Sequence, residues 1–285
     1  MVMNNMITGD VETEDGARVS YMRFGVGSRR LVFIPGAGDG LADASGAARR
    51  LSWWMRDRAR RFDVLYVSRR SGLTRDVSLE RQADDVARVM EHLSFGPALI
   101  EAQSAGGSIG QLLAARRPDL APALVLSSSS AHLNDQTRAM CARWLDLAHA
   151  RDWEGFFDAT APVFFPGPTG AMLRSFSGLL RDLITPEDPR RVEAILEQLI
   201  TFDHRELLTD LSVPVLISAG ADDLIFPTAQ QHEMATLIPR STLILSPGFG
   251  HSHDLENPAH VDRVAAFARL HGVALRGTTP HGHVA

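Results

Sequence analysis

The chain has 285 residues, 45% apolar and 22% charged, and its 29 basic and 34 acidic residues give a net charge of −5, values typical of a soluble globular protein. All 29 basic residues are arginine, which excludes chemistry that needs a lysine, such as a Schiff base or a phosphate-loop lysine. The mild acidity and the lack of a basic block argue against nucleic acid or an anionic membrane as a partner. A single cysteine, Cys141, excludes an intramolecular disulfide and argues against a cysteine-based zinc site.

The N-terminal residues 1–16 are polar and acidic and lack the basic start and apolar run of a signal peptide. No window approaches the roughly 20 apolar residues of a membrane span. We therefore expect a cytoplasmic protein, which an unpaired cysteine suits. The length lies near the upper limit for a single hydrophobic core, so one domain with an insertion is expected. The sequence leaves open whether the chain is a monomer or a homodimer.

Short apolar runs bounded by Gly, Pro or Ser alternate with longer segments of helical period, which is typical of a parallel sheet with helices on both faces. The first two predicted strands, Val11–Thr13 and Arg18–Phe24, form an antiparallel hairpin. The buried strands predicted to follow are Leu31–Ile34, Val64–Val67, Ala98–Glu101, Leu124–Ser127, Val215–Ser218 and Thr242–Leu245.

Two segments have the apolar stripe of an amphipathic helix. In Ser78–Leu93 the apolar residues recur at steps of four and three, and Ser78 is predicted to cap the helix. Pro258–Leu270 repeats the pattern, with a proline at the first helical position after Asn257.

Residues 131–208 have helical periodicity but no convincing strand, and they hold eight of the chain's 19 Phe, Trp and Tyr residues. We therefore divide the chain into an α/β core of residues 1–130 and 209–275, a helical insertion of residues 131–208 and a frayed tail at 276–285. The aromatic residues form either the insertion's own core or an apolar pocket over a site on the sheet. The candidates for such a pocket are Trp144, Phe157, Phe164 and Phe165.

A serine turn follows the strand Ala98–Glu101. The run Ala102-Gln103-Ser104-Ala105-Gly106 leads from the strand into a helix, with small residues two before and two after the serine. Such a turn strains the serine backbone and projects its Oγ above the sheet. This segment resembles the G-x-S-x-G nucleophile elbow of the α/β-hydrolase superfamily. Ala102 replaces the first glycine, and we expect slight strain there rather than loss of function.

The resemblance implies an acid and then a histidine later in the chain. After the seventh predicted strand, Asp223 stands three residues after a glycine and four before a proline, which is the register of the family's acid. Asp222 is interpreted as a turn or cap residue. After the last strand, a Gly-His pair followed by Glu-x-Pro is similar to the family's histidine loop and selects His251. His253 lies nearby but lacks the preceding glycine.

The resemblance also implies an oxyanion hole formed by two backbone amides. One is that of Ala105, which follows the nucleophile, and the other is that of Ala37, in the glycine-rich loop after the strand Leu31–Ile34. Pro35 stands where the family commonly has histidine, but it does not remove the Ala37 amide.

In the loop Ser68–Thr74 the family tends to have Asp-x-x-Gly, whereas this chain has a pair of arginines, Arg69 and Arg70. We interpret the pair either as a holder of an acidic substrate or, in preference, as solvated surface.

Together these features predict an α/β-hydrolase fold, with a mostly parallel eight-stranded sheet flanked by helices and a helical cap. The implied function is that of a serine hydrolase, similar to esterases and enol-lactonases, that cleaves a carboxylic ester or lactone of a medium-sized apolar or aromatic small molecule. No cofactor and no metal are expected. Carbon–carbon bond hydrolysis and cofactor-free perhydrolase or haloperoxidase chemistry stay open, as does a ligand receptor that retains the fold without catalysis.

Overall fold

In the described part of the chain, eight strands form one sheet in the order β1-β2-β4-β3-β5-β6-β7-β8. The computed structural model describes residues 6–46, 48, 54–165 and 185–273, so the tail predicted at 276–285 lies outside the described residues. The strands are β1 (Ile7–Glu12), β2 (Arg18–Phe24), β3 (Arg29–Ile34), β4 (Phe62–Arg70), β5 (Leu99–Gln103), β6 (Ala123–Ser127), β7 (Val215–Gly220) and β8 (Ser241–Ser246).

The sheet is mostly parallel, as predicted. β1 and β2 form the antiparallel hairpin, β2 pairs antiparallel with β4, and the neighbouring strands from β4 to β8 are parallel. The strand boundaries differ from the predicted ones most in β1 and β4. β1 begins at Ile7, and the prediction missed its first residues because this mostly exposed edge strand lacks the apolar alternation of a half-buried strand. β4 continues to Arg70, and it is buried at every position, charged residues included.

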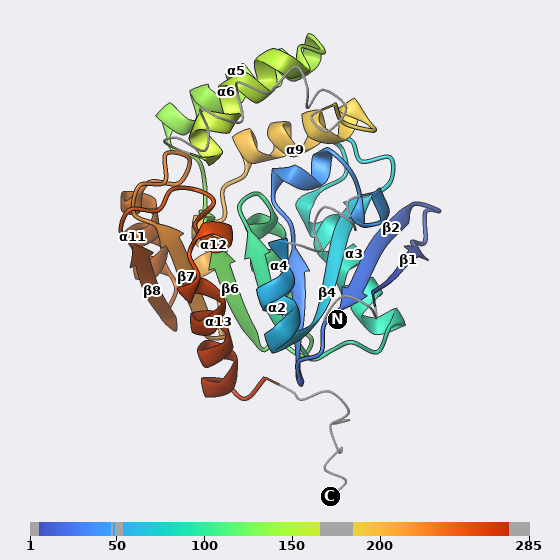
Figure 1. Cartoon of the computed structure of the whole chain (residues 1–285), viewed down its shortest axis with the longest axis vertical. Coiled ribbons are helices and arrows are strands. Elements are labelled where there is room, and N and C mark those ends of the chain that lie inside the picture. The colour runs from blue at the N-terminus through green and yellow to red at the C-terminus, as the bar shows by residue number, and fades with distance from the viewer. Residues whose placement is uncertain (1–5, 47, 49–53, 166–184, 274–285) are drawn as a thin grey trace, which may run out of the picture.

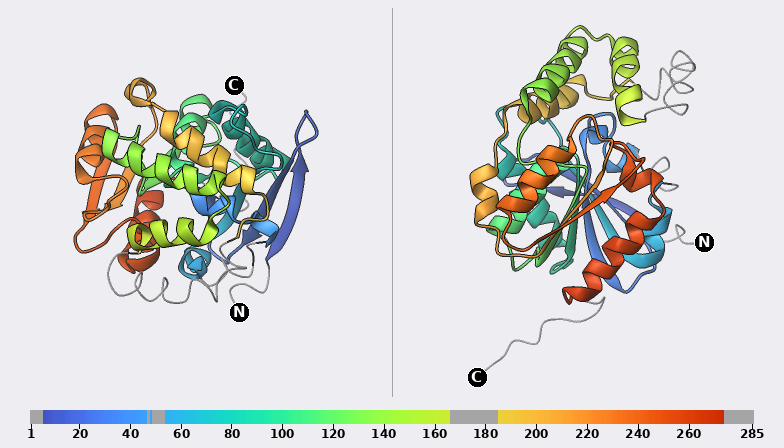
Figure 2. Two further views of the ribbon diagram at one scale, coloured as in Figure 1. Left: turned by 90° about the horizontal axis from the view of Figure 1, so that it is seen from above. Right: turned by 90° about the vertical axis from the view of Figure 1, so that its left-hand side faces the viewer.

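Helices cover both faces of the sheet (Figure 2). The helices of the described residues are η1 (Ala37–Gly40, a 3-10 turn), α2 (Arg56–Arg61), α3 (Leu79–His92), α4 (Gly106–Arg116), α5 (Asp135–His149), α6 (Trp153–Phe164), α9 (Pro189–Thr201), α10 (Arg205–Thr209), α11 (Thr228–Leu237), α12 (His253–Glu256) and α13 (Ala259–Leu270).

Alternate residues of the strands feed two hydrophobic cores. In β3, Val32 and Ile34 pack on the side of α3 and α4, whereas Leu31 and Phe33 pack on the side of α2 and α13. This period of two is the geometry of a strand buried on both faces. The sheet is therefore held between two layers of helices, and its carboxyl edge is left for loops.

The two predicted amphipathic helices begin at the expected caps. The Oγ of Ser78 accepts a hydrogen bond from the Arg81 amide at the start of α3. At the start of α13, Pro258 has helical dihedral angles, and Oδ1 of Asn257 accepts from the Ala259 amide at 3.0 Å. The proline thus occupies the first helical turn, where its missing N–H costs nothing.

Helices α5, α6 and α9, which come between β6 and β7, lie over the carboxyl edge of the parallel strands (Figure 1). Their apolar residues, among them Trp144, Ile195 and Phe202, share a third core with Ala105 and Phe226 from the loops of the sheet. The division of the chain at residues 131 and 208 stays a prediction. None of the described helices is both long enough and apolar enough to cross a bilayer.

Candidate active site

Ser104 lies at the tip of a sharp turn between β5 and α4. Its φ of +51° is a left-handed conformation that costs a non-glycine residue about 1–3 kcal/mol, so the surroundings must hold it. Its amide donates to the carbonyl of Ser127, at the end of β6, at 2.9 Å. A Cβ on Gly106 would lie 2.5 Å from the carbonyl oxygens of Ile34 and Pro35. Only glycine therefore lets α4 begin so close to the backbone that follows β3.

The departure at Ala102 from the family's elbow is accommodated by a second glycine. Ala102 is fully buried, and a Cβ added to Gly110 in α4 would lie 2.5 Å from the Ala102 Cβ. The methyl group of Ala102 thus occupies space that Gly110 leaves empty. This packing explains how the elbow forms without glycine at its first position.

Side chains from three loops form a chain of hydrogen bonds at the carboxyl edge of the sheet. Oγ of Ser104 lies 3.0 Å from Nε2 of His251, and Nδ1 of His251 lies 2.9 Å from Oδ2 of Asp223. Because a carboxylate only accepts hydrogen bonds, the neutral ring carries its proton on Nδ1, which leaves Nε2 to accept from the serine hydroxyl. This arrangement can turn a serine into a nucleophile.

The loop after β7 fixes the acid. Oδ1 of Asp223 accepts from the amides of Ile225 at 2.8 Å and Phe226 at 3.1 Å, which aims the carboxylate at the histidine. Asp223 is 3% exposed, whereas Asp222 faces solvent. The structure thus places Asp223, the acid that the register selected, next to His251. Asp222 is exposed to solvent instead.

The amides of Ala37 and Ala105 flank this site. Ala37 begins η1, separated from the end of β3 by Pro35 and Gly36, and Ala105 lies directly before α4. Neither amide donates to another group in the described part of the chain. The helix beginning at Gly106 adds the partial positive charge of its N-terminus. Both amides are thus available to an anionic oxygen formed near Ser104.

Two aromatic rings contact the histidine. Phe164, at the end of α6, meets the His251 ring edge-to-face with centroids 5.0 Å apart, and Trp144 stacks behind it at 5.9 Å. The ring of Phe226, in the loop after β7, has its centroid 5.5 Å from that of the His251 ring. Sequence reasoning missed Phe226, although it precedes the proline of the acid loop.

The other two pocket candidates are less closely connected to the histidine. The Phe165 ring contacts that of Trp54, with centroids 6.4 Å apart. Phe157 has no ring contact within the described residues.

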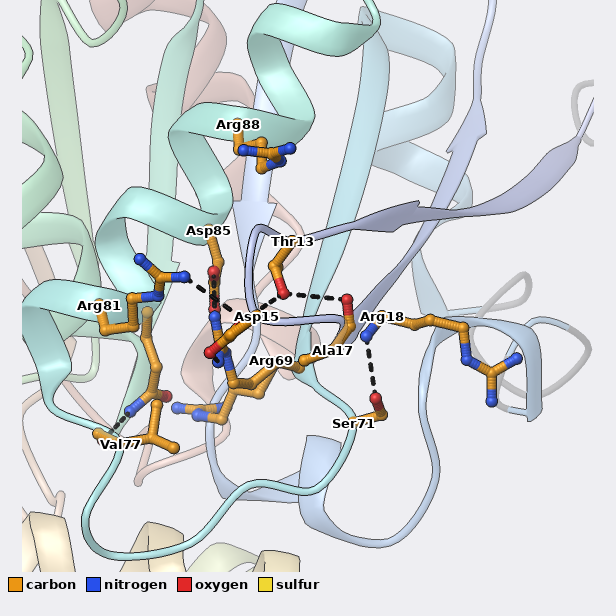
Figure 3. Close-up of polar contacts among 12 residues, drawn as sticks. Thr13, Asp15, Ala17, Arg18, Arg69, Ser71, Val77, Arg81, Asp85 and Arg88 are labelled. Atoms are coloured by element: carbon orange, nitrogen blue, oxygen red, sulfur yellow. Dashed lines mark hydrogen bonds and ion pairs between the residues drawn. The ribbon is translucent and has the colours of Figure 1, made fainter.

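Arg69 and Arg70 do not face solvent, so the preferred interpretation of them is wrong. Both side chains are only 4% exposed. The Arg70 guanidinium donates to both oxygens of Asp85 at 2.7 Å and to Asp15 at 2.6 Å. Figure 3 shows Asp15 in the β1–β2 turn and Asp85 on α3, with Arg81 approaching Asp15 from the same helix. A sequence cannot show that acidic residues from two distant segments meet one arginine.

A family model matches most of the chain. The model of the alpha/beta hydrolase fold family matches residues 31–258, a span that contains Ser104, Asp223, His251 and both flanking loops. The chain belongs to the alpha/beta hydrolase fold family. The predicted family and fold are thereby confirmed, and the protein is a hydrolase.

Relatives of this hydrolase are named for different substrates. A protein of Caulobacter sp. (strain K31) named "Putative carbamate hydrolase RutD" is 27% identical over 206 residues, 68% of this chain and 75% of the relative. A pimeloyl-[acyl-carrier protein] methyl ester esterase of Nitrosomonas europaea is 27% identical over 199 residues, 66% of this chain and 77% of the relative.

Among solved structures, the enol-lactonase from Burkholderia xenovorans LB400 has a TM-score of 0.76 at 20% identity, covering 92% of this chain and 100% of that one. This last likeness is one of fold.

Behind the serine turn the hydrolase has a buried polar network that sequence reasoning missed. Glu101, in β5, accepts from Arg58 of α2 at 2.6 Å and lies 2.9 Å from Nε2 of His260. Ser218 links His260 to His253, at 3.2 and 3.0 Å. In the described part of the chain no group of three or more His, Cys, Asp or Glu side chains is arranged to hold a metal ion.

His253 should make the stability of the hydrolase depend on pH. Burial, followed by the neighbouring His260, lowers the pKa of His253 to about 2. In the unfolded chain the His253 ring takes up a proton when the pH falls below its ordinary pKa near 6.5. In the folded protein the ring stays neutral until the pH falls to about 2. The folded state thus has its full stability above pH 6.5, and the free energy of unfolding falls by up to about 1.4 kcal/mol per pH unit on this account as the pH decreases from 6 to 4.

Urea unfolding at several pH values tests this expectation. The slope of unfolding free energy against pH should be shallower in His253→Gln than in the unsubstituted hydrolase, whatever the absolute stability of the variant. Equal slopes would show that the His253 ring does not cause the loss.

Proposed function

We propose that this hydrolase cleaves a carboxylic ester or a lactone of a medium-sized apolar or aromatic substrate through an acyl-enzyme on Ser104. The hydrogen-bond chain from Ser104 through His251 to Asp223 carries the proposal. It joins a nucleophile, a base and an orienting acid, the groups that acyl transfer to water needs. The partner in this proposal is a small-molecule substrate, and the mechanism uses no cofactor.

In the first half of the reaction, Oγ of Ser104 attacks the substrate carbonyl while its proton passes to Nε2 of His251. The tetrahedral intermediate then collapses, and Nε2 returns the proton to the departing alkoxide. In the second half, a water molecule attacks the acyl-enzyme with His251 as base, and the acid is released as Ser104 regains its proton. Asp223 holds the ring in the required tautomer and stabilises its charged form.

The amides of Ala37 and Ala105 are proposed to bind the oxyanion of the tetrahedral intermediate. Charge develops on that oxygen only after attack, so donors placed in advance stabilise the transition state more than the bound substrate. Losing one such donor typically costs about 3 kcal/mol. The buried position of the site strengthens these bonds, because water does not compete for them.

The aromatic contacts with His251 support the proposed apolar substrate. In the variant Phe164→Ala, the ratio of kcat/KM for p-nitrophenyl hexanoate to kcat/KM for p-nitrophenyl acetate should fall roughly 10-fold. Each buried methylene is worth about 0.8 kcal/mol, so this fall corresponds to losing the burial of about two methylenes of the acyl chain. Initial rates over an acyl-chain series measure this selectivity.

Phe156→Ala is the matched control, since Phe156 lies on the same helix but packs against Trp153. An unchanged chain-length profile in Phe164→Ala would contradict the role of this ring, and activity confined to short charged esters would contradict the apolar pocket as a whole.

A panel of esters, lactones, thioesters and carbamates, with products identified by mass spectrometry, tests the reaction class. The carbamates belong in the panel because a relative bears that name. Release of free acid from an ester or lactone is the expected result. Turnover of carbamates alone would contradict the proposed substrate class.

Labelling with a fluorophosphonate separates an enzyme from a binding protein. A serine activated by His251 should become covalently phosphonylated, and peptide mapping should place the label on Ser104. A protein that binds ligand but takes up no label would instead be a receptor that retains the fold.

A further inference from the structure

Arg69 connects the end of β4 to the loop that carries the Ala37 amide. Its Nη1 donates to the carbonyl oxygens of Pro35 and Gly36, at 3.1 Å each. Its own amide donates to Oδ2 of Asp39 at 2.9 Å. The side chain is only 4% exposed, and its guanidinium is bonded to the backbone of the loop.

The bond to Gly36 bears directly on the proposed oxyanion donor. The carbonyl of Gly36 and the N–H of Ala37 belong to one trans peptide group, so they point in opposite directions. Fixing the oxygen toward Arg69 therefore turns the N–H to the other side of the loop. A Cβ on Gly36 would lie 2.8 Å from the Cβ of Ser104, so this loop packs directly against the nucleophile.

The charge of Arg69 adds to this orienting effect. A hydrogen bond from a guanidinium to a carbonyl is charge-assisted, and hydrogen bonds in series polarise one another in a buried site. A cation on the oxygen of the Gly36–Ala37 peptide group thus makes its N–H a stronger donor. The effect grows when negative charge forms at the other end of the group, as it does in the transition state.

A second arginine anchors the same loop from the helices above the sheet. Arg191, in α9, donates from Nε to the carbonyl of Asp39 at 2.9 Å and from Nη2 to Oδ2 of Asp39 at 2.6 Å. It also donates to the Arg69 carbonyl at 2.8 Å. The loop is therefore held between β4 and α9, with little freedom to let its peptide groups rotate.

We infer that Arg69 is a positioning residue for catalysis: it orients and polarises the Gly36–Ala37 peptide group so that the Ala37 amide binds the oxyanion. This inference rests on the proposed function. Arg69 acts through the peptide group and does not touch the substrate. Its contribution is therefore expected in the stabilisation of the tetrahedral intermediate rather than in substrate binding.

The test compares Arg69→Met with Arg70→Met. The two arginines are adjacent in β4 and equally buried, so each change removes a buried guanidinium. Only Arg69 bonds to the loop, whereas Arg70 pairs with Asp85 and Asp15. The amount of folded, active enzyme in each preparation is counted by end-point labelling with a fluorophosphonate.

Arg69→Met should lower kcat for an ester about 10- to 100-fold, approaching the loss of one oxyanion donor, with little change in KM. Its affinity for an alkyl trifluoromethyl ketone, which forms a tetrahedral oxyanion with the serine, should fall by a similar factor. Arg70→Met should melt at a lower temperature, because it leaves Asp85 unpaired, but should keep its kcat per labelled molecule.

Arg69→Lys extends the test in case the methionine variant does not fold. A lysine ammonium keeps the charge but reaches fewer acceptors than the guanidinium fork, so kcat and ketone affinity should lie between those of the methionine variant and the unsubstituted hydrolase. Unchanged kcat and ketone affinity in the folded Arg69 variants would overturn the inference alone. An unsubstituted chain that hydrolyses no member of the substrate panel would overturn the proposed function, and the inference with it.

Discussion

Replacing Ser104 by alanine should reduce hydrolysis of a p-nitrophenyl ester to background while the fold stays intact. In a serine triad the loss of the nucleophile alone costs on the order of 10⁶-fold in kcat, because the remaining groups have nothing to activate. The Ser104 hydroxyl bonds to Nε2 of His251, whereas the strained turn is held through its backbone, which alanine retains. Initial rates measure the loss of hydrolysis. Thermal unfolding monitored by circular dichroism shows whether the fold stays intact.

Ser108→Ala is the control for this variant. Ser108 is a buried serine in the first turn of α4, and its hydroxyl donates to the Ala105 carbonyl at 2.9 Å rather than to the histidine. The Ser108→Ala variant should keep its hydrolytic activity. Full activity in Ser104→Ala would show that the nucleophile lies elsewhere, and loss of activity together with loss of the folded state would require His251→Gln to decide the question.

Arg58→Met should destabilise the hydrolase more than any other substitution considered. The Arg58 guanidinium bonds to both oxygens of Glu101, at 2.6 and 3.0 Å, and to Oδ2 of Asp254 at 3.2 Å. Burial by itself raises the pKa of Glu101, but Arg58 and His260 outweigh it and hold this pKa well below its ordinary value. The variant leaves two buried carboxylates without their cation, which costs about 3–5 kcal/mol in comparable buried pairs.

Arg60→Met is the matched control for this loss. Arg60 lies on the same short helix, α2, but its side chain is 55% exposed and pairs with an equally exposed Asp57, so its removal should cost less than about 1 kcal/mol. Urea unfolding of both variants at pH 7 gives the comparison. Similar losses in the two variants would mean that the Arg58 network contributes no more than a surface ion pair.

The positions of the strands could be predicted because their residues are apolar over short runs bounded by turn formers. The fold then explains why loops far apart in the sequence converge. The carboxyl ends of β5, β7 and β8 lie on one edge of the sheet, so the loops that carry Ser104, Asp223 and His251 emerge side by side. The family's chain order of serine, acid and histidine is therefore enough to nominate these residues without any coordinates.

The charged residues at the end of β4 show where a pattern fails. A pair of arginines after an apolar run normally indicates a solvated loop, but here it continues a buried strand. What changes the outcome is ion pairing and hydrogen bonding with residues such as Asp85 and the loop after β3, which lie at large sequence distances. The buried contacts of His253 and His260 could not be predicted for the same reason, since their shared partner Ser218 comes from β7, far away in the sequence.

The sequence by itself determined the order of the strands, the two amphipathic helices at Ser78–Leu93 and Pro258–Leu270, the strained serine turn with its small neighbours, and the register that selects Asp223 over Asp222, because each depends on residues close together in the chain. Only the tertiary structure decided which partners the buried charges have, that Gly110 makes room for Ala102, that Phe164 and Phe226 contact His251, and that Arg69 bonds to the loop holding the Ala37 amide. These depend on distances between segments, which packing sets and which no local pattern encodes.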